Sequence, residues 1–344
     1  MAGGTGERFW PVSTPALPKQ LLDLTGEGKS MLANALDRLE PVVGKDRLWV
    51  STSQTLADPI IEAGLVDGDH VLAEPARRNT LGAIVWTMAS LSSQTDGPFA
   101  VAFTTSDHAI RPTDAFVETV RSALRIAEEH QALTTIGIPP TRPETGFGYI
   151  ERNADGTVSR FTEKPDALTA ASFLAQGTYF WNSGMFFWTE EAFARELEHA
   201  QPAAFTVYRS IADLLRVGDT AGACVAFESL PSISIDYALM EHAERVRCVP
   251  ATFAWDDVGT WDSLLRTVPL DEDGNAVVGQ ATLFGGSNNV VYGTTDQRIV
   301  ASGVEGMIIA VTDDYVYVGR VDDAQSVRNI AKAIQQPEGD APAR

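Results

Sequence analysis

The chain has 344 residues, of which 44% are hydrophobic and 21% charged, and its formal net charge is −20. That acidic balance argues against nucleic acid and membranes as partners, because anionic polymers and lipids are bound through basic surfaces. No apolar run reaches the roughly 20 residues of a transmembrane helix. A chain longer than about 250–300 residues predicts a large domain with a smaller one beside it.

The cysteines and histidines give no sign of a metal or redox centre. Cys224 and Cys248 are the only cysteines and form no recognisable motif, which favours a reducing, cytoplasmic compartment. The 5 histidines are scattered, and none pairs with another at metal-ligand spacing. The composition therefore favours a small molecule as the partner.

The first half of the chain is predicted to alternate helices and strands. Helices are expected at 30–39, 79–91 and 113–127, and strands at 46–52, 71–75, 99–103 and 133–138. This alternation predicts an α/β fold with a Rossmann-like, mostly parallel sheet flanked by helices. A glycine-rich phosphate loop in such a fold follows a buried strand, and here only Met1 precedes Ala2. We therefore expect the first strand to be missing, its place in the sheet to be unfilled and the stability to be lowered.

The pattern changes after Glu144. We expect a hairpin over 148–161 with an Asp155-Gly156 turn, then helices at 166–175, 190–200, 203–216 and 236–243 and one ending near 266, with strands at 185–188 and 246–249. Short strands separated by Gly and Asn over 277–318 suggest a curled, short β-helix-like sheet before a final helix at 323–334. The expected domains are a catalytic domain at 1–268, a β-rich domain at 269–335 and a disordered tail at 336–344.

The strongest functional signal lies at the start of the chain. Gly3, Gly4 and Gly6 free the backbone to curl, so that successive N–H groups can hold a phosphate chain. Arg8 and Lys19 bring positive charge suited to phosphate oxygens. For the bare glycine cluster alone, an ordinary tight turn is the alternative.

Two carboxylates lie where a ligand site is expected. Asp107 follows an apolar strand, and Asp257 lies in Trp-Asp-Asp-Val-Gly before the helix near 260. Each could instead cap a helix or a turn. Together with the phosphate loop, however, they form the set that Mg²⁺-dependent nucleotidyl transfer requires.

The string Gly-Gly-x-Gly-x-Arg-x-Trp-Pro, followed by Pro-Lys-Gln, resembles the signature of the sugar-phosphate nucleotidyltransferase family, especially its mannose-1-phosphate guanylyltransferases. The resemblance runs across nearly the whole chain and implies transfer of GMP from GTP to mannose 1-phosphate, which yields GDP-mannose and pyrophosphate. It implies Mg²⁺ on Asp107 and Asp257, with Lys164 orienting the attacking phosphate. Arg8 and Lys19 would then stabilise the departing pyrophosphate.

The same resemblance implies two sets of substrate contacts. The nucleotide set comprises Gly3, Gly4, Gly6, Glu74, Pro75, Arg78, Asn79, Thr80 and Ser106. The sugar-phosphate set comprises Gly146, Tyr149, Glu163, Asn182 and Asp236. From the residues alone, the alternatives are a loop with an Asn cap at 74–80, a turn with a core tyrosine at 144–149, a surface pair at 163–164 and a helix cap at 236.

Other functions remain open. The motifs also fit a nucleotidyltransferase for another base or sugar, such as a heptose 1-phosphate, and a non-catalytic regulatory subunit that binds GDP-mannose. A dinucleotide-dependent oxidoreductase is disfavoured by the glycine spacing, and an appended metal-dependent isomerase by the lack of histidine in 270–344. Thr105, Thr14 and Phe147 depart from the family pattern without removing a needed charge. We expect a homodimer, because curled C-terminal sheets present edges that can pair.

Overall fold

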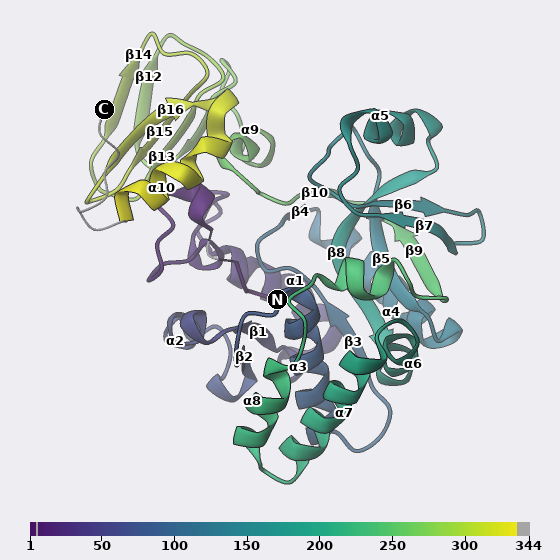
Figure 1. The fold of residues 1–344 in the computed structure, drawn as a ribbon. Helices are drawn as coiled ribbons and strands as arrows, with labels where there is room; N and C mark the ends of the chain where they lie inside the picture. The colour runs from purple at the N-terminus through teal and green to yellow at the C-terminus, as the bar shows by residue number, and fades with distance from the viewer. Residues whose placement is uncertain (5, 336–344) are drawn as a thin grey trace.

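The computed structural model describes residues 1–4 and 6–335, so the tail expected at 336–344 lies outside the described residues. Figure 1 shows an α/β body with a strand-rich C-terminal region at one side, next to the N-terminal segment. The expected α/β sheet flanked by helices is confirmed. No helix in the described part of the chain combines the length and the apolar character needed to cross a bilayer.

The largest sheet is organised around β8 (Tyr179–Thr189). One half of β8 lies between β3 (Ala100–Phe103) and β5 (Leu133–Ile138), and the other half between β5 and β6 (Tyr149–Arg152). β8 is antiparallel to all three, so β3 and β5 run in the same direction. Their carboxyl ends therefore meet at one edge of the sheet, where a ligand site is expected.

Two further strands complete this sheet. β9 (Val246–Pro250) pairs with β5 in parallel, and β7 (Val158–Thr162) pairs with β6 as the second strand of the predicted hairpin.

The two faces of β8 are both buried, each under a different set of helices. Phe186 and Trp188 pack in a core with α3, α6, α7 and α8, whereas Met185 and Phe187 pack in a core with α4 and α5. The helices of the body are α1 (Met31–Val43), α2 (Gln54–Glu62), α3 (Asn79–Gln94), α4 (Thr113–His130), α5 (Ala167–Gln176), α6 (Glu190–Ala200), α7 (Pro202–Arg216), α8 (Thr220–Glu228) and α9 (Leu264–Thr267). Strands buried on both faces of a sheet have nearly continuous apolar sequence, and residues 185–188 of β8 show this pattern.

A separate parallel pair, β1 (Val50–Ser53) and β2 (Val71–Glu74), lies beside the first residues of the chain. The amide of Ala2 donates to the Ser51 carbonyl at 2.7 Å, and Ala2 forms a parallel bridge with Thr52. Among the described residues, β1 pairs only with β2 and β3 only with β8, apart from this bridge. The first two residues thus lie beside the carboxyl end of β1, and the absence of a preceding strand stays an expectation.

The C-terminal region consists of short stacked strands. β11 (Ala276–Val278), β13 (Val290–Gly293) and β15 (Met307–Val311) form a parallel ladder, and β16 (Val316–Arg320) closes it antiparallel to β15. β12 and β14 form a second parallel ladder over Ala281–Phe284 and Ile299–Ser302. Two such ladders are what successive rungs of a solenoid produce.

Buried asparagines fix the register of these rungs. The Asn275 side-chain oxygen accepts the backbone N–H of Asn289 at 3.0 Å, and the Asn289 oxygen accepts the N–H of Met307 at 2.9 Å. Both asparagines are 1% exposed or less, so these bonds satisfy groups that water cannot reach. The expected boundary at 268 falls between α9 and β11.

Two of the predicted helices begin at side-chain caps. Ser30 caps α1 by accepting the Ala33 N–H, and Asp166 caps α5 by accepting the Thr169 N–H. The helices α2 and α8 were not predicted, because their short apolar stripes resemble loop sequence. The predicted helix at 236–243 is instead a single π-helical turn at Asp236–Met240.

Candidate active site

Asp107 and Asp257 are brought together by a two-stranded ladder. β4 (Ala109–Arg111) follows Asp107 closely, and β10 (Ala254–Asp256) directly precedes Asp257. The two strands are antiparallel, with Asp256 opposite Ala109. Asp107 and Asp257 therefore lie at the same end of the ladder, although they are far apart in sequence.

Lys19 lies between the two aspartates. Its ammonium donates to Asp107 Oδ2 at 2.9 Å, to the Asp107 carbonyl at 3.0 Å and to the Asp257 carbonyl at 3.1 Å. An ammonium has three N–H donors, so all of them are engaged. Lys19 is 6% exposed. In this structure its hydrogen bonds join the segments that contain Asp107 and Asp257.

The pKa values of the two carboxyl groups are shifted in opposite directions. Burial raises the pKa of Asp257 to about 6, and the neighbouring charge of Asp256 adds to this effect. Burial alone would also raise the pKa of Asp107, but the Lys19 ammonium holds it below its ordinary value. The Asp257 carboxylate makes no hydrogen bond to another described residue.

This arrangement fits a divalent cation. Lys19 holds the two aspartate segments together, and a cation would relieve the repulsion from Asp256 and Asp107 that adds to the effect of burial on the pKa of Asp257. No cluster of three or more His, Cys, Asp or Glu suitable for a metal exists among the described residues. A cation here would therefore need substrate oxygens or water to complete its ligands.

A buried scaffold positions Asp257. Asp256 accepts the Val258 N–H at 2.9 Å and the Arg266 guanidinium at 2.7 Å. Val258 has a φ of 46°, a left-handed conformation that is costly for a β-branched residue. Its side chain is fully buried in a core, which holds the chain in this conformation.

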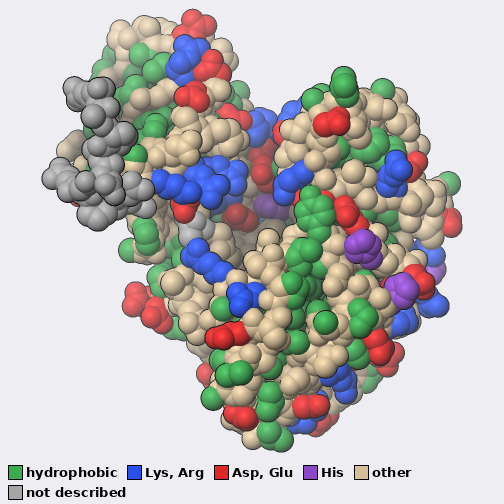
Figure 2. Space-filling model, in the orientation of Figure 1, with side chains coloured by type: hydrophobic (Ala, Val, Ile, Leu, Met, Phe, Trp, Pro, Cys, Tyr) green, Lys and Arg blue, Asp and Glu red, His purple; other side chains and the backbone are tan. Residues whose placement is uncertain are grey.

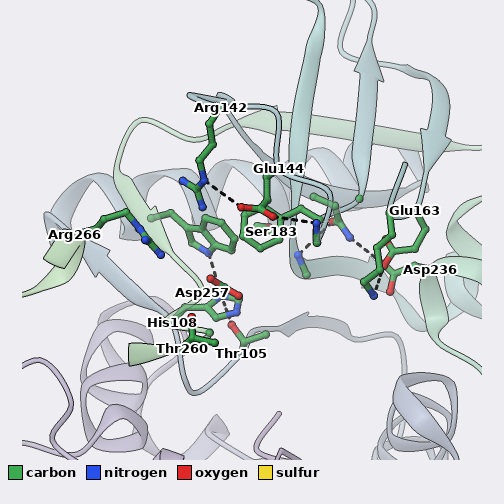
Figure 3. Close-up of a pocket in the computed structure, with 18 of the residues that line it drawn as sticks. Thr105, His108, Arg142, Glu144, Glu163, Ser183, Asp236, Asp257, Thr260 and Arg266 are labelled. Atoms are coloured by element: carbon green, nitrogen blue, oxygen red, sulfur yellow. Dashed lines mark hydrogen bonds and ion pairs between the residues drawn. The ribbon is translucent and has the colours of Figure 1, made fainter. Parts of the chain in front are cut away.

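His108 ties the two segments together a second time. The Trp255 indole donates to His108 Nδ1 at 3.0 Å, and Thr105 Oγ1 lies 2.5 Å from the same nitrogen. An indole N–H can only donate, so Nδ1 is the acceptor and the ring is neutral. Burial lowers the pKa of His108 to about 4, which agrees with a neutral ring. These residues are labelled at one side of the site in Figure 3, except Trp255.

A cavity of about 420 Å³, which we call pocket B, lies beside the glycine loop. The predicted nucleotide residues that line it are Gly3, Gly4, Glu74, Asn79 and Thr80, and Asp107 and Thr105 lie at its edge. The loop is held by Gln20, whose amide donates to the Gly4 carbonyl at 2.8 Å. Nothing lies within 4 Å of a Cβ placed on Gly3, so its backbone is open to the cavity.

Glu74 is the one acidic group in the part of pocket B formed by β2 and α3. Its Oε2 atom is buried and has no hydrogen-bond partner among the described residues. Burial raises the pKa of this carboxyl to about 7, although the nearby Arg77 opposes the shift. An unpartnered buried carboxyl is suited to accept hydrogen bonds from a ligand.

The first turn of α3 is bonded to the segment that precedes Asp236. Thr80 Oγ1 accepts the Ile235 N–H at 2.8 Å, and the Leu81 N–H donates to the Ile233 carbonyl at 3.3 Å. The predicted nucleotide segment and the predicted sugar segment are therefore in direct contact.

A second cavity of about 450 Å³, pocket A, lies on the other side of Thr105. The predicted residues that line it are Arg8, Gly146, Glu163, Lys164, Asn182, Asp236 and Asp257. Figure 3 shows Glu163 and Asp236 at one end of this pocket and Asp257, Thr260 and Arg266 at the other. Figure 2 shows the surface hollowed between the C-terminal region and the rest of the chain.

The end of pocket A that holds Glu163 and Asp236 is built from fixed polar groups. Asn182 donates from Nδ2 to Asp236 at 2.8 Å, while its oxygen accepts from Thr135 and Gly184. Burial raises the pKa of Asp236 to about 6, and the charge of Glu163 adds to it. Glu163 pairs with Lys164 at 2.9 Å.

Gly148 leaves room for Glu163. A Cβ placed on Gly148 would come within 2.5 Å of Glu163 Oε2, so any side chain there would displace the carboxylate. Lys164 itself has a φ of 45°, which turns the chain sharply after Glu163.

Besides Lys19, five predicted site residues lie outside both cavities. Tyr149 is fully buried and packs on Phe173, which favours the core alternative. Arg78 points its guanidinium at the Glu228 carbonyl, 2.8 Å away. Pro75 borders β2, Ser106 donates its N–H to the Met1 carbonyl, and Gly6 turns the loop with a φ of 65°.

The structure also brings in residues that sequence reasoning missed. Arg142 and Glu144 form an ion pair at 3.1 Å over pocket A, and Arg266 and Asp262 lie near Asp257. No local signal marks Arg142, Asp262 or Arg266, whereas Glu144 begins the 144–149 segment already singled out. Gln20, Thr105 and His108 could have been found, because they lie inside motifs already singled out.

Comparison with known proteins identifies the family. A family model described as nucleotidyl transferase matches residues 1–274. The xanthan biosynthesis protein XanB of Xanthomonas campestris pv. campestris (strain B100) is 38% identical, over 97% of this chain and 72% of the relative. A mannose-1-phosphate guanylyltransferase of Sinorhizobium fredii is 34% identical, over 99% of this chain and 68% of the relative.

A solved structure agrees over the same length. It is described as mannose-1-phosphate geranyltransferase from Thermus thermophilus, with 33% identity, a TM-score of 0.86 and coverage of 98% of each chain. The family model covers most of the chain, and relatives at 34–38% identity match nearly all of it. The chain therefore belongs to the nucleotidyl transferase family.

Proposed function

We propose that this chain transfers GMP from GTP to mannose 1-phosphate with Mg²⁺, forming GDP-mannose and releasing pyrophosphate. The observation that carries the proposal is the meeting of Asp107 and Asp257 at the boundary between pocket B and pocket A. Nucleotidyl transfer requires two substrates held on opposite sides of one phosphorus atom, and this boundary supplies that place. The relatives named as mannose-1-phosphate guanylyltransferases support the choice of guanine and mannose.

The nucleoside is assigned to pocket B. Glu74 would accept the N–H groups on the Watson–Crick edge of guanine, which present two neighbouring donors to a carboxylate. Adenine lacks this pair of donors, so the unpartnered Glu74 oxygen favours GTP over ATP. The amides of Gly3 and Gly4 would hold the phosphates that follow.

The sugar phosphate is assigned to pocket A. Asn182, Asp236 and Glu163 offer oxygen and amide groups for the sugar hydroxyls. Lys164 is half-exposed beside them and would orient the phosphate.

The reaction needs no covalent enzyme intermediate. An oxygen of the sugar phosphate bonds to the α-phosphorus, the bond from that phosphorus to the bridging oxygen breaks, and the electron pair leaves with pyrophosphate. Asp107 and Asp257 would hold Mg²⁺, which when bound neutralises charge on the α-phosphate. Arg8 would stabilise the leaving group, and Lys19 could join it only by exchanging one of its present bonds.

We also propose a cytoplasmic homodimer that pairs through the C-terminal region. Val316 and Val318 on β16 are 69% and 58% exposed, and Phe284 on β12 is 62% exposed. Exposed apolar residues on an edge strand favour pairing with a second copy. Light scattering during gel filtration tests this, and a monomer that persists at high concentration contradicts it.

The deciding experiment measures pyrophosphate release with GTP, ATP, UTP and dTTP, each crossed with mannose 1-phosphate, glucose 1-phosphate and a heptose 1-phosphate. Release with GTP and mannose 1-phosphate alone, abolished by EDTA, is the expected result. A different active pair would reassign the substrates. If the protein binds GDP-mannose tightly but releases no pyrophosphate in any combination, it is a regulatory subunit and not an enzyme.

A further inference from the structure

The C-terminal region reaches pocket A at the end beside the glycine-loop segment, because its turn Val321–Ser326 contacts the turn Glu7–Phe9. Gln325, in the 3₁₀ turn Val321–Ser326 before α10 (Val327–Gln335), lines this end together with Arg8, Gly259 and Thr260. It is the single residue beyond 270 among those that line pocket A in the described part of the chain.

The backbone of Gln325 is firmly anchored on both sides. Ala324 is 3% exposed and Val327 is fully buried, and both lie in one hydrophobic core with Phe9 and Trp10. Arg8 belongs to that same glycine-loop segment. Gln325 and Arg8 therefore lie on segments that pack into the same core, and this packing fixes the distance between their backbones.

An ion pair adds a second link. Arg328 Nε lies 3.1 Å from Glu7 Oε2, so α10 is joined directly to the residue before Arg8. The pair is partly exposed, and such pairs orient side chains more than they stabilise a fold.

The Gln325 side chain itself is free. It is exposed, and within residues 1–4 and 6–335 no hydrogen bond engages its amide. An amide can donate to a phosphate oxygen without adding charge beside Asp257 and Asp262. Figure 2 shows basic side chains on the part of the C-terminal region that faces the same hollow.

We propose that Gln325 is a further substrate-binding residue, which holds the leaving pyrophosphate together with Arg8, and that the Arg328–Glu7 pair positions it. This inference rests on the proposed function, because that function assigns the nucleoside to pocket B and the sugar to the other end of pocket A. The phosphates that depart must then leave on the Arg8 side. The C-terminal region would accordingly contribute a substrate-binding residue to the active site.

The test uses the full chain and measures equilibrium binding of pyrophosphate, GTP and GDP-mannose with Mg²⁺ by calorimetry. Gln325→Ala should weaken pyrophosphate and GTP about tenfold, the effect of one lost hydrogen bond to a charged group. GDP-mannose, which lacks the leaving pyrophosphate, should bind unchanged. Gln325→Glu keeps the shape, and its charge should weaken pyrophosphate further.

Asn329→Ala is the matched control, because Asn329 is another exposed amide on α10 that does not line pocket A. Arg328→Glu should weaken pyrophosphate binding, and the double exchange with Glu7→Arg should restore it, which a merely structural loss would not do. If Gln325→Ala matches Asn329→Ala while the unchanged protein binds all three ligands, this inference is overturned and the proposed function stands. If the unchanged protein binds none of them, both are overturned.

Discussion

The Lys19 ammonium lies 2.9 Å from Asp107 Oδ2. Asp107 is one of the two carboxylates that we propose as metal ligands. Lys19 therefore supplies, in the ligand-free protein, part of the positive charge that a cation would supply. A divalent cation must compete with this ammonium or share Asp107 with it.

Lys19→Met should make the protein less stable without metal and more responsive to metal. Removing one partner of this pair leaves a carboxylate uncompensated at a cost of about 2 kcal/mol, less than for a fully buried pair. Thermal unfolding in EDTA should show the loss, and Mn²⁺ or Mg²⁺ should raise the melting temperature more than in the unchanged protein. Lys29→Met, which breaks an exposed pair with Asp37, serves as the control. Equal metal responses in both variants would contradict the competition.

Asp257→Asn should lower turnover by about 10²–10³-fold while GTP binding survives in part, because a metal ligand is lost and pocket B is untouched. Steady-state kinetics and GTP titration separate these effects. Turnover near that of the unchanged protein would remove the metal assignment.

The same variant should be more stable than the unchanged protein when metal is absent. The folded pKa of Asp257, about 6, lies above its ordinary value, so ionisation opposes folding as the pH rises. The gain should reach about 2 kcal/mol at about pH 8 and largely vanish near about pH 3, where the carboxyl is mostly protonated in both states. Urea unfolding in EDTA at both pH values measures it.

Glu74 should make guanine recognition depend on pH. Its pKa of about 7 means that the carboxylate needed by guanine forms only as the pH passes neutrality. The ratio of GTP to ATP affinity should therefore rise from about pH 6 to about pH 8. ATP is the internal control, since its phosphates titrate like those of GTP. In Glu74→Gln the ratio should be low and flat, and a ratio that still rises would assign the pH effect elsewhere.

Gly148→Ala should impair sugar-phosphate binding selectively. The added Cβ would meet Glu163 Oε2 within 2.5 Å, whereas at Gly146 the nearest atom is the Glu144 carboxylate at 3.3 Å. We expect the KM for mannose 1-phosphate to rise about tenfold or more in Gly148→Ala and less in Gly146→Ala, with the KM for GTP preserved in both. Equal effects on both substrates would indicate a general disturbance of the fold.

Local sequence signals predicted most helices and strands of the body. The helices that begin at Ser30 and Asp166 were predicted within a residue or two, because the cap and the apolar periodicity that define a helix act within a few turns. The glycine loop and the two aspartates were visible because their chemistry is carried by short motifs. In the structure, Gly3, Gly4 and Asp107 line pocket B and Asp257 lines pocket A.

Contacts between distant segments were not accessible to the same reasoning. Lys19 was expected to face phosphates, yet its three donors meet groups that lie far along the chain. Tyr149 was expected at the sugar, but alternation along β6 turns it into the core. Arg142 and Arg266 carry no motif, so only the fold reveals that they flank the cavity.

The bond from the Ile235 N–H to Thr80 Oγ1 means that neither substrate can move its own binding segment alone. A nucleotide that shifts the first turn of α3 also shifts the residue before Asp236. Under the proposed function, linkage is reciprocal, so the factor by which the sugar phosphate changes nucleotide affinity equals the factor by which the nucleotide changes sugar-phosphate affinity. The order in which the two substrates arrive should not alter the total free energy of the ternary complex.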